Sequence, residues 1–207
     1  MIQTDHNRSH HGEYTLASGA AAVRGLFVLH NIYGPAGRRI LLQAGLKAGM
    51  HVADLGAGSG FYTMAAAPLV GQTGRVFAVE VQKDLLARLK SDSAREGLAN
   101  VEVVWGDVEK IGGTRLRDHS IDRAIVSNIL FQIETKEDFA KEVKRILKPE
   151  GKAMVIDWSS TASFGGPAAS SLVKKEAAIE LFNKAGMVLE KEFSAGDNHY
   201  GLIFKKS

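Results

Sequence analysis

Short runs rich in apolar and β-branched residues alternate with longer segments of helical period from about residue 50 onward. This order is typical of a parallel β-sheet covered by helices, because parallel strands are joined by crossover connections that are usually helices. The runs predict strands at residues 50–55, 75–80, 101–106, 121–127 and 152–158. The alternation therefore favours an α/β fold.

Two of the predicted helices have recognisable ends. The segment 83–96 carries leucines on one stripe and is followed by Gly97, a residue type that often ends helices. The next helix opens at Thr135, which forms a capping-box pattern with Asp138, and it ends before Pro149. These signals place helices between the predicted strands, as a parallel sheet requires.

The end of the chain departs from the alternation. After a loop at 159–171 and a predicted helix over about 171–185, the segments MVLEKEF and HYGLIFKK are separated only by SAGDN. A join of this length is too short for a crossover helix, so the two terminal strands should be antiparallel to each other. We therefore expect a mainly parallel sheet that finishes with one reversed strand.

Length and composition are those of one ordinary globular domain. The chain has 207 residues, of which 45% are hydrophobic and 24% are charged. It contains no cysteine, which excludes disulfides, thiolate nucleophiles and cysteine metal sites and fits a reducing cytoplasm. Residues 1–14 lack the apolar core of a secretory signal, and no apolar run is long enough to span a bilayer. We expect a cytoplasmic protein without a membrane span.

The distribution of charge bears on the partners of the chain. The formal net charge is +3, but basic residues are interleaved with acidic ones and form no long block. This pattern is typical of a solvated surface, so nucleic acid is allowed as a partner but is not favoured. Residues 1–49 are also too few for an added RNA-recognition domain.

The residues before the first strand are predicted to be partly helical, over 20–30 and 36–44, with a break at NIYGP. We expect residues 1–35 to form an N-terminal tail and helical lid, with Tyr33 reaching across a bound ligand. The histidines within 6–11 have no further organised ligand set beside them, so no metal site is expected.

The segment VADLGAGSGFYT places Gly56, Gly58 and Gly60 at a strand-to-helix turn. In an open parallel sheet, ligands bind outside the carboxyl ends of the strands near the switch point, which makes this turn the expected binding site. The alternative is that the glycines only permit a tight turn and close packing of helix and strand. Acidic residues elsewhere in the chain favour a ligand.

Three acids stand at the ends of three successive predicted strands. Glu80 can accept hydrogen bonds from two ribose hydroxyls, and Asp107 can accept one from an exocyclic amine while Trp105 or Val108 covers a ring face. Taken alone, Asp107 is as well explained as the N-cap of a helix. Asp54 puts a negative charge before the turn, which suits a cationic ligand better than the pyrophosphate of the G-x-G-x-x-G dinucleotide fingerprint.

These residues resemble the class I S-adenosylmethionine-dependent methyltransferases, in particular the group related to the ubiquinone/menaquinone C-methyltransferases. The similarity covers roughly residues 36–205, and its elements are VADLGAGSGFYT, VFAVEVQ, VWGDVE, DRAIVSNILFQIE, LKPEGK, VIDW and HYGLIFKK. It implies a Rossmann-like three-layer α/β/α sandwich over residues 36–207, with a seven-stranded, mainly parallel sheet and an antiparallel last strand. It also implies S-adenosyl-L-methionine as cofactor and S-adenosyl-L-homocysteine as product.

The resemblance implies a role for each position that matches the family pattern. Asp54 and the turn 56–60 would hold the methionine part, Glu80 the ribose, and Asp107 with Val108 the adenine. Ser127 and Asn128 would lie near the reactive methyl group. The expected cofactor-binding residues are Asp54, Gly56, Ala57, Gly58, Gly60, Glu80, Val81, Gly106, Asp107, Val108, Ser127, Asn128 and Tyr33.

Methyl transfer from a sulfonium needs mainly alignment, because the donor is already activated. A base is needed only if the acceptor must lose a proton. The two candidate catalytic residues are Asn128 and Asp157, and other candidates for a base are Glu134, His199, His30 and Tyr33. For each of these a purely structural role is the alternative.

The predicted function is methyl transfer to an unidentified acceptor, most favourably a small molecule. The segment SNIL after the fourth strand is not of the Asn-Pro-Pro-Tyr type, which weakens nucleobases and glutamine as acceptors. Three alternatives stay open: an RNA or protein methyltransferase of the same fold, a non-catalytic adenosine-ligand binding module, and a nicotinamide dehydrogenase. The sequence does not indicate the acceptor atom or the oligomeric state.

Overall fold

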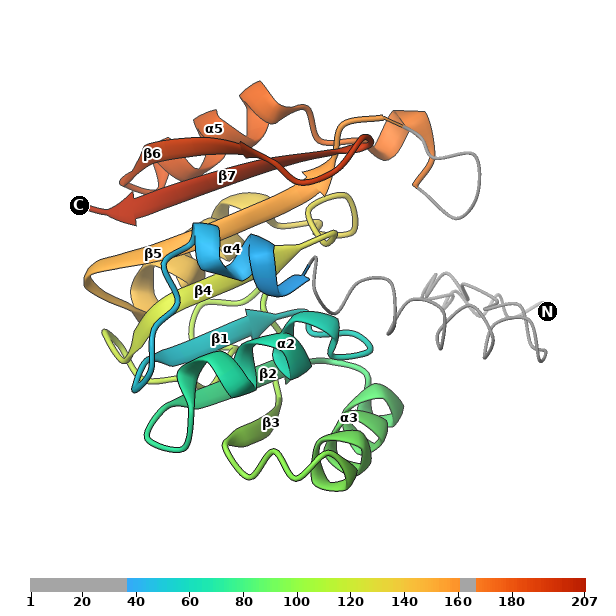
Figure 1. Cartoon of the computed structure of the whole chain (residues 1–207). Coiled ribbons are helices and arrows are strands. Elements are labelled where there is room, and N and C mark those ends of the chain that lie inside the picture. The colour runs from blue at the N-terminus through green and yellow to red at the C-terminus, as the bar shows by residue number, and fades with distance from the viewer. Residues whose placement is uncertain (1–36, 161–166) are drawn as a thin grey trace, which may run out of the picture.

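A seven-stranded sheet with helices on both faces runs through the computed structural model, which describes residues 37–160 and 167–207 (Figure 1). The order of the strands across the sheet is β3-β2-β1-β4-β5-β7-β6. In chain order the strands are β1 His51–Leu55, β2 Arg75–Glu80, β3 Val101–Trp105, β4 Ile121–Ser127, β5 Leu147–Trp158, β6 Met187–Ser194 and β7 His199–Lys206.

The direction of the strands confirms the expected topology. The pairs β1/β2, β2/β3, β1/β4 and β4/β5 are parallel, whereas β7 is antiparallel to both of its neighbours, β5 and β6. β7 is therefore the one reversed strand of the described sheet. The short join between β6 and β7 forces this reversal, since it leaves no room for a crossover helix.

Two helical layers cover the sheet (Figure 1). Residues 37–43, α2 (Phe61–Val70) and α3 (Lys83–Arg95) lie on one face, and α4 (Lys136–Ile146) and α5 (Lys175–Lys184) lie on the other. This division follows from right-handed crossovers, because β1-α2-β2 and β2-α3-β3 move in one direction across the sheet and β4-α4-β5 moves in the other. A short 3-10 turn, η1 Ala169–Ser171, precedes α5.

Each face of the sheet has its own apolar core. Phe139, Phe182 and Phe204 are fully buried between the sheet and the α4/α5 layer, where the rings of Phe182 and Phe204 stack with centroids 4.8 Å apart. Leu41 and Met154 belong to the core on the α2 side. The central strands are buried on both faces, which explains why they appear in the sequence as continuous apolar runs.

Some element ends differ from the prediction. β5 begins at Leu147, five residues earlier than expected, because Leu147 pairs with Ile121 before the register shifts ahead of Lys152. α5 begins at Lys175, and the residues before it include the 3-10 turn. The predicted helix 20–30 and the lid over residues 1–35 lie outside the described residues.

The capping box predicted between Thr135 and Asp138 at the start of α4 is wrong. Thr135 is the N-cap residue, but its hydroxyl donates to the backbone carbonyl of Glu109 at 2.9 Å and makes no capping bond. The carboxylate of Glu109 instead accepts hydrogen bonds from the backbone N–H groups of Glu134 and Thr135, at 2.8 and 3.0 Å. The start of α4 is thus fixed by a residue from the loop after β3, which a local pattern does not show.

No helix within residues 37–160 and 167–207 is long and apolar enough to cross a bilayer. In the same residues, no three or more histidine, aspartate or glutamate side chains come together in a way that would hold a metal ion. The histidines within 6–11 lie outside these ranges.

Candidate functional site

A cavity of about 430 Å³ opens at the carboxyl ends of β1, β2 and β4 and beside the segment that follows β3. This is where the switch in strand order places a ligand site in an open parallel sheet. Of the thirteen predicted cofactor residues, eleven line it: Asp54, Gly56, Ala57, Gly58, Glu80, Val81, Gly106, Asp107, Val108, Ser127 and Asn128. Gly60 does not line the cavity, and Tyr33 lies outside the described residues.

The glycines of the turn serve different purposes. A Cβ on Gly56 would lie 2.1 Å from Cδ1 of Ile129, and a Cβ on Gly60 would lie 1.9 Å from Cδ1 of Leu89. A Cβ on Gly58 would meet only a backbone oxygen at 3.9 Å. Two of the three glycines therefore make room for side chains of this chain, and only Gly58 faces open space in the cavity.

We expect Gly60→Ala to lower the free energy of unfolding by roughly 2–4 kcal/mol, because its methyl group would overlap Leu89 and the backbone is left-handed. The φ angle of Gly60 is +82°. Gly97→Ala is the matched control, since Gly97 has φ +68° with nothing within 4 Å. Urea unfolding of both variants measures the difference. An equal loss in the two proteins would contradict the packing explanation.

Glu80 fastens the glycine turn to the end of β2. Its side chain is buried, and its Oε2 accepts a hydrogen bond from the backbone N–H of Gly58 at 3.0 Å. Its Oε1 accepts from the N–H groups of Val81 and Gln82, at 2.8 and 3.0 Å. A carboxylate oxygen can accept about two hydrogen bonds. One acceptor position, on Oε2, therefore remains for a ligand.

Asp54 is a buried carboxyl group in the wall of the cavity. It is 3% exposed and accepts a 2.6 Å hydrogen bond from the hydroxyl of Thr63. Burial raises the pKa of Asp54 to about 6, and the nearby charge of Glu80 adds to the rise, while the hydrogen bonds from Thr63 oppose it. A cation bound beside Asp54 would favour its ionised form.

The raised pKa of Asp54 gives a testable pH dependence. The folded state binds this proton more tightly than the unfolded chain, so the contribution to stability is present below pH 3.8 and is lost as the pH rises through about 6. Asp54→Asn removes this loss, so we expect the variant to exceed the wild type in free energy of unfolding by about 1–3 kcal/mol at pH 8. At pH 4 the two proteins should be nearly equal. Urea titrations from pH 4 to pH 8 measure this difference in the free energy of unfolding. A difference that does not change with pH would contradict the raised pKa of Asp54.

Asp107 has partners on both carboxylate oxygens. The backbone N–H of Glu109 donates to Oδ1 at 3.0 Å, and the ammonium of Lys110 pairs with Oδ2 at 2.8 Å. The hydrogen bond from Lys110 lowers the pKa of Asp107, so the group is a carboxylate. No described helix starts at Asp107, which excludes the N-cap alternative. The carboxylate remains at the cavity with acceptor capacity left on each oxygen.

Trp105 does not cover the cavity. Its indole N–H donates to the carbonyl of Val81 at 2.9 Å, and the charged groups of Lys83 and Arg115 lie 5.0 and 4.6 Å from the ring centre. Val108, which is 8% exposed, lines the cavity in its place. Of the two residues proposed to cover a ring, only Val108 has the right position.

The loop after β3 is held against α4 by a buried ion pair. Glu142 is fully buried and accepts hydrogen bonds from the N–H of Gly112 at 2.7 Å and from the backbone N–H of Thr114 at 3.2 Å. Arg145 pairs with both of its carboxylate oxygens at 2.7 Å. Burial alone would raise the pKa of Glu142, but the hydrogen bonds from Arg145, Thr114 and Gly112 outweigh it and lower the pKa. This network fixes the loop that carries Asp107.

The two candidate catalytic residues have different environments. Asn128 has φ +53° and lines the cavity, and among the described residues its buried Oδ1 has no hydrogen-bond partner. Asp157 is fully buried, does not line the cavity, and accepts 2.8 Å hydrogen bonds from the N–H groups of Leu130 and Trp158. Burial raises the pKa of Asp157. Its geometry supports a positioning role for the segment after β4 and does not support direct contact with an acceptor.

The remaining base candidates do not converge on the cavity. Glu134 is exposed at the start of α4 and does not line it. His199 lies at the start of β7, two strands from Asn128. His30 and Tyr33 lie outside the described residues. The sequence patterns did not indicate Ile129, which lines the cavity and packs directly against Gly56. Its apolar character gave no signal that distinguished it from the core.

The strand order, the single reversed strand and a cavity with acids at three strand ends define a class I S-adenosylmethionine-dependent methyltransferase fold. The chain belongs to the family described as Methyltransferase domain, which matches residues 46–197.

Similar proteins agree with this assignment. The chain is 31% identical over 117 residues to the ubiquinone/menaquinone biosynthesis C-methyltransferase UbiE of Pseudomonas fluorescens, covering 56% of this chain and 44% of that protein. It is 35% identical over 122 residues to an arsenite methyltransferase of Aquipseudomonas alcaligenes, covering 56% of this chain and 35% of that protein. The chain thus spans less than half the length of these relatives. A solved structure of a SAM dependent methyltransferase from Aquifex aeolicus is 27% identical, with a TM-score of 0.76 over 83% of this chain and 89% of that one.

Proposed function

We propose that this chain binds S-adenosylmethionine and transfers its methyl group to a small organic molecule, with release of S-adenosylhomocysteine. The observation that carries the proposal is the placement of Asp54, Glu80 and Asp107 around one cavity at the ends of β1, β2 and β3. In this proposal Asp54 attracts the cationic part of the cofactor, Glu80 accepts from its ribose, and Asp107 accepts from its adenine. Membership of the methyltransferase domain family supports the same reading.

The residues present fit this cofactor. Gly58 leaves open space where the backbone of the turn meets the cavity, and the buried Oδ1 of Asn128 needs a donor that the described residues do not supply. Among the described lining residues there are four carboxylates, Asp54, Glu80, Asp107 and Glu109, and no lysine or arginine. This negative wall suits a sulfonium and an ammonium better than the diphosphate of NAD.

The residues of the chain would bind the cofactor, orient it and shield it from water. When bound, S-adenosylmethionine supplies a methyl group that is already activated for displacement. Glu80 offers one acceptor on Oε2 to a ribose hydroxyl, so a second hydroxyl would need to displace a backbone hydrogen bond or find another partner. Val108 excludes water from one side of the cavity. Asn128 would orient the polar end of the cofactor through its unpartnered carbonyl oxygen.

The proposed acceptor class follows from the relatives and from the composition. One relative acts in ubiquinone/menaquinone biosynthesis and the other on arsenite. A soft centre such as trivalent arsenic prefers thiolate ligands, and these 207 residues contain no cysteine. We therefore favour an organic acceptor. Tyr33 in a lid over residues 1–35 and a cytoplasmic location remain predictions within this proposal.

A thermal-shift comparison tests the cofactor. S-adenosylhomocysteine at about one hundred times its Kd should stabilise the protein by about 2.7 kcal/mol, and NAD should have no effect. Stabilisation by NAD alone would overturn the proposal in favour of a dehydrogenase.

A labelling experiment tests the acceptor. Donor labelled in its methyl group is incubated with the protein and with lysate separated into small molecules, RNA and protein. We expect label in the small-molecule fraction. Label only in macromolecules would favour an RNA or protein methyltransferase, and binding without transfer to any fraction would favour a non-catalytic module.

A further inference from the structure

Asp54 differs from the other three carboxylates that line the cavity. Three backbone N–H groups donate to Glu80, two donate to Glu109, and the ammonium of a lysine lies 2.8 Å from Asp107. Asp54 is held by the hydroxyl of Thr63 at 2.6 Å, and no cation of the described chain acts on it. With 3% of its surface exposed, it is also out of reach of most solvent. Its negative charge is therefore the least compensated of the four.

The elements around Asp54 add further negative charge to the cavity. β2 contributes Glu80, and the segment after β3 contributes Glu109 and the carboxylate of Asp107, which is paired with Lys110. The end of β4 and the start of α2 contribute only uncharged side chains. None of the described residues that line the cavity is a lysine, an arginine or a histidine. A positively charged ligand would supply the compensation that these lining residues do not.

The methyl donor and its product differ by one positive charge. S-adenosylmethionine carries a sulfonium, an ammonium and a carboxylate, whereas S-adenosylhomocysteine has a neutral thioether in place of the sulfonium. In the transfer, sulfur keeps both electrons of its bond to the methyl carbon, and the acceptor supplies the electron pair for the new bond. The ligand in the cavity thus loses its net positive charge in each turnover, while the carboxylates around it stay in place.

We propose that Asp54 makes the cavity distinguish the methyl donor from its product by charge, so that the cationic donor is bound more tightly than the neutral product. This inference rests on the proposed function, because it concerns the same cavity and the same cofactor. It names Asp54 as the residue that determines the preference. The preference favours release of the product after each transfer.

The state of Asp54 makes this preference depend on pH. Burial raises the pKa of Asp54 to about 6 in the protein without ligand. A bound cation stabilises the carboxylate and lowers that pKa, so binding of a cation releases a proton below about pH 6 and becomes tighter as the pH rises. A neutral ligand does not lower the pKa. Each unit by which the cation lowers it changes the ratio of the two affinities roughly tenfold between acid and alkaline pH.

Sinefungin and S-adenosylhomocysteine are matched probes for the test. Sinefungin carries an amine-bearing carbon in place of the methylsulfonium, so it is cationic but has no methyl group to transfer. Calorimetric titration gives both affinities between pH 5 and pH 8. We expect the preference for sinefungin to rise roughly fivefold over this range if the cation lowers the pKa of Asp54 by about one unit. Titrations near pH 5.5 in buffers of different ionisation enthalpy should show proton release with sinefungin and none with S-adenosylhomocysteine.

Asp54→Asn should abolish the rise of the preference with pH, because an amide does not titrate. Asp107→Asn is the matched control. The hydrogen bond from Lys110 lowers the pKa of Asp107, so this group stays ionised from pH 5 to pH 8. Its removal should lower the preference for sinefungin equally at every pH and leave the rise intact.

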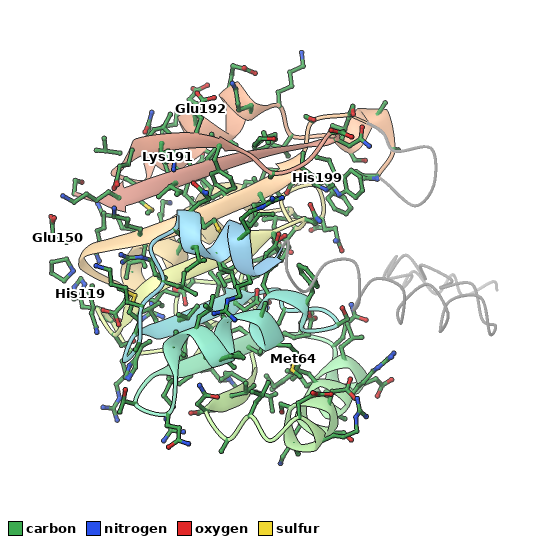
Figure 2. All side chains as sticks on the ribbon, in the orientation of Figure 1. Met64, His119, Glu150, Lys191, Glu192 and His199 are labelled. Carbon is green, nitrogen blue, oxygen red and sulfur yellow. The ribbon has the colours of Figure 1, made fainter. Side chains whose placement is uncertain are left out.

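Thr63→Val gives a second test that does not depend on folding of the Asp54 variant. Thr63 lies in the first turn of α2, beside Met64, which Figure 2 labels on this helix. The hydrogen bonds from Thr63 oppose the rise in the pKa of Asp54. Without the hydroxyl, the pKa should be higher, and the increase in preference should move to higher pH. A residue that only holds the turn in place would not move this midpoint.

The outcomes separate this inference from the proposed function. Saturable binding of both ligands with a ratio that does not change with pH would overturn the role of Asp54 and leave the cofactor assignment standing. A rise that persists in Asp54→Asn would do the same. A pH-dependent preference without transfer of label to any fraction would leave the charge discrimination standing and remove the proposed methyl transfer. Binding of neither ligand would overturn both.

Discussion

Glu142→Ala should lower the free energy of unfolding by about 3–5 kcal/mol, because it removes the buried partner of Arg145 and leaves this largely buried charge only the exposed carboxylate of Asp118. The same change removes the acceptor for the N–H groups of Gly112 and Thr114. These bonds hold the loop after β3 against α4. We therefore also expect weaker binding of S-adenosylhomocysteine, since Asp107 and Val108 lie on this loop. Urea unfolding and calorimetric titration measure the two effects.

Glu180→Ala is the matched control for this change. Glu180 also lies on a helix and pairs with a lysine four residues on, Lys184, but its side chain is 67% exposed. An exposed pair of this kind contributes little to stability, because solvent screens the two charges. Glu142→Gln keeps the shape and one acceptor and should fall between the two. A loss for Glu142→Ala no larger than that for Glu180→Ala would show that the buried network does not stabilise the fold.

Glu80→Ala should weaken the binding of S-adenosylhomocysteine by about 1–3 kcal/mol, or roughly 5- to 150-fold. Two causes add up. The variant lacks the remaining acceptor on Oε2 for a ribose hydroxyl, and it releases the N–H of Gly58, which Glu80 holds at 3.0 Å. Calorimetric titration at neutral pH gives the affinity directly.

Glu102→Ala serves as the control for Glu80. Glu102 lies on the neighbouring strand β3, is exposed, and does not line the cavity. Its removal should leave the affinity unchanged within error. Glu80→Gln separates the two causes, because an amide oxygen can still accept from Gly58 or from a hydroxyl but not with the strength of a carboxylate. If Glu80→Ala binds S-adenosylhomocysteine as tightly as the wild type, the ribose assignment is wrong.

The fold could be predicted from local patterns because its main features depend on periodicity and loop length. The strand at 75–80 matches the observed β2 at both ends, and the helix predicted at 83–96 ends within one residue of α3. The start of β5 could not be predicted, because Pro149 and Gly151 are typical of a break. They lie instead in an extended segment whose first residue, Leu147, pairs with Ile121 of β4.

The ligand cavity was also largely predictable, since residues at the ends of neighbouring parallel strands meet at one edge of the sheet. The side-chain directions within that edge were not. Gly60 accommodates Leu89 of α3, Trp105 packs under Lys83 and Arg115, and Asp157 is fully buried beneath the segment after β4. Each of these depends on a contact between residues far apart in the chain or on a side-chain rotamer.

The order of the elements, the reversed last strand and the three acids at strand ends were thus determined by the sequence itself, because periodicity, short joins and residue type act locally. Tertiary structure alone decided which side chains line the cavity and which use their hydrogen-bonding groups to hold its walls in place. Glu109 and Glu142 fasten one wall of the cavity to α4, and the pairing of β5 with β7 brings Trp158 and His199 together. The physical reason is that these contacts join segments separated by 25 or more residues, whose meeting depends on packing of the whole sheet.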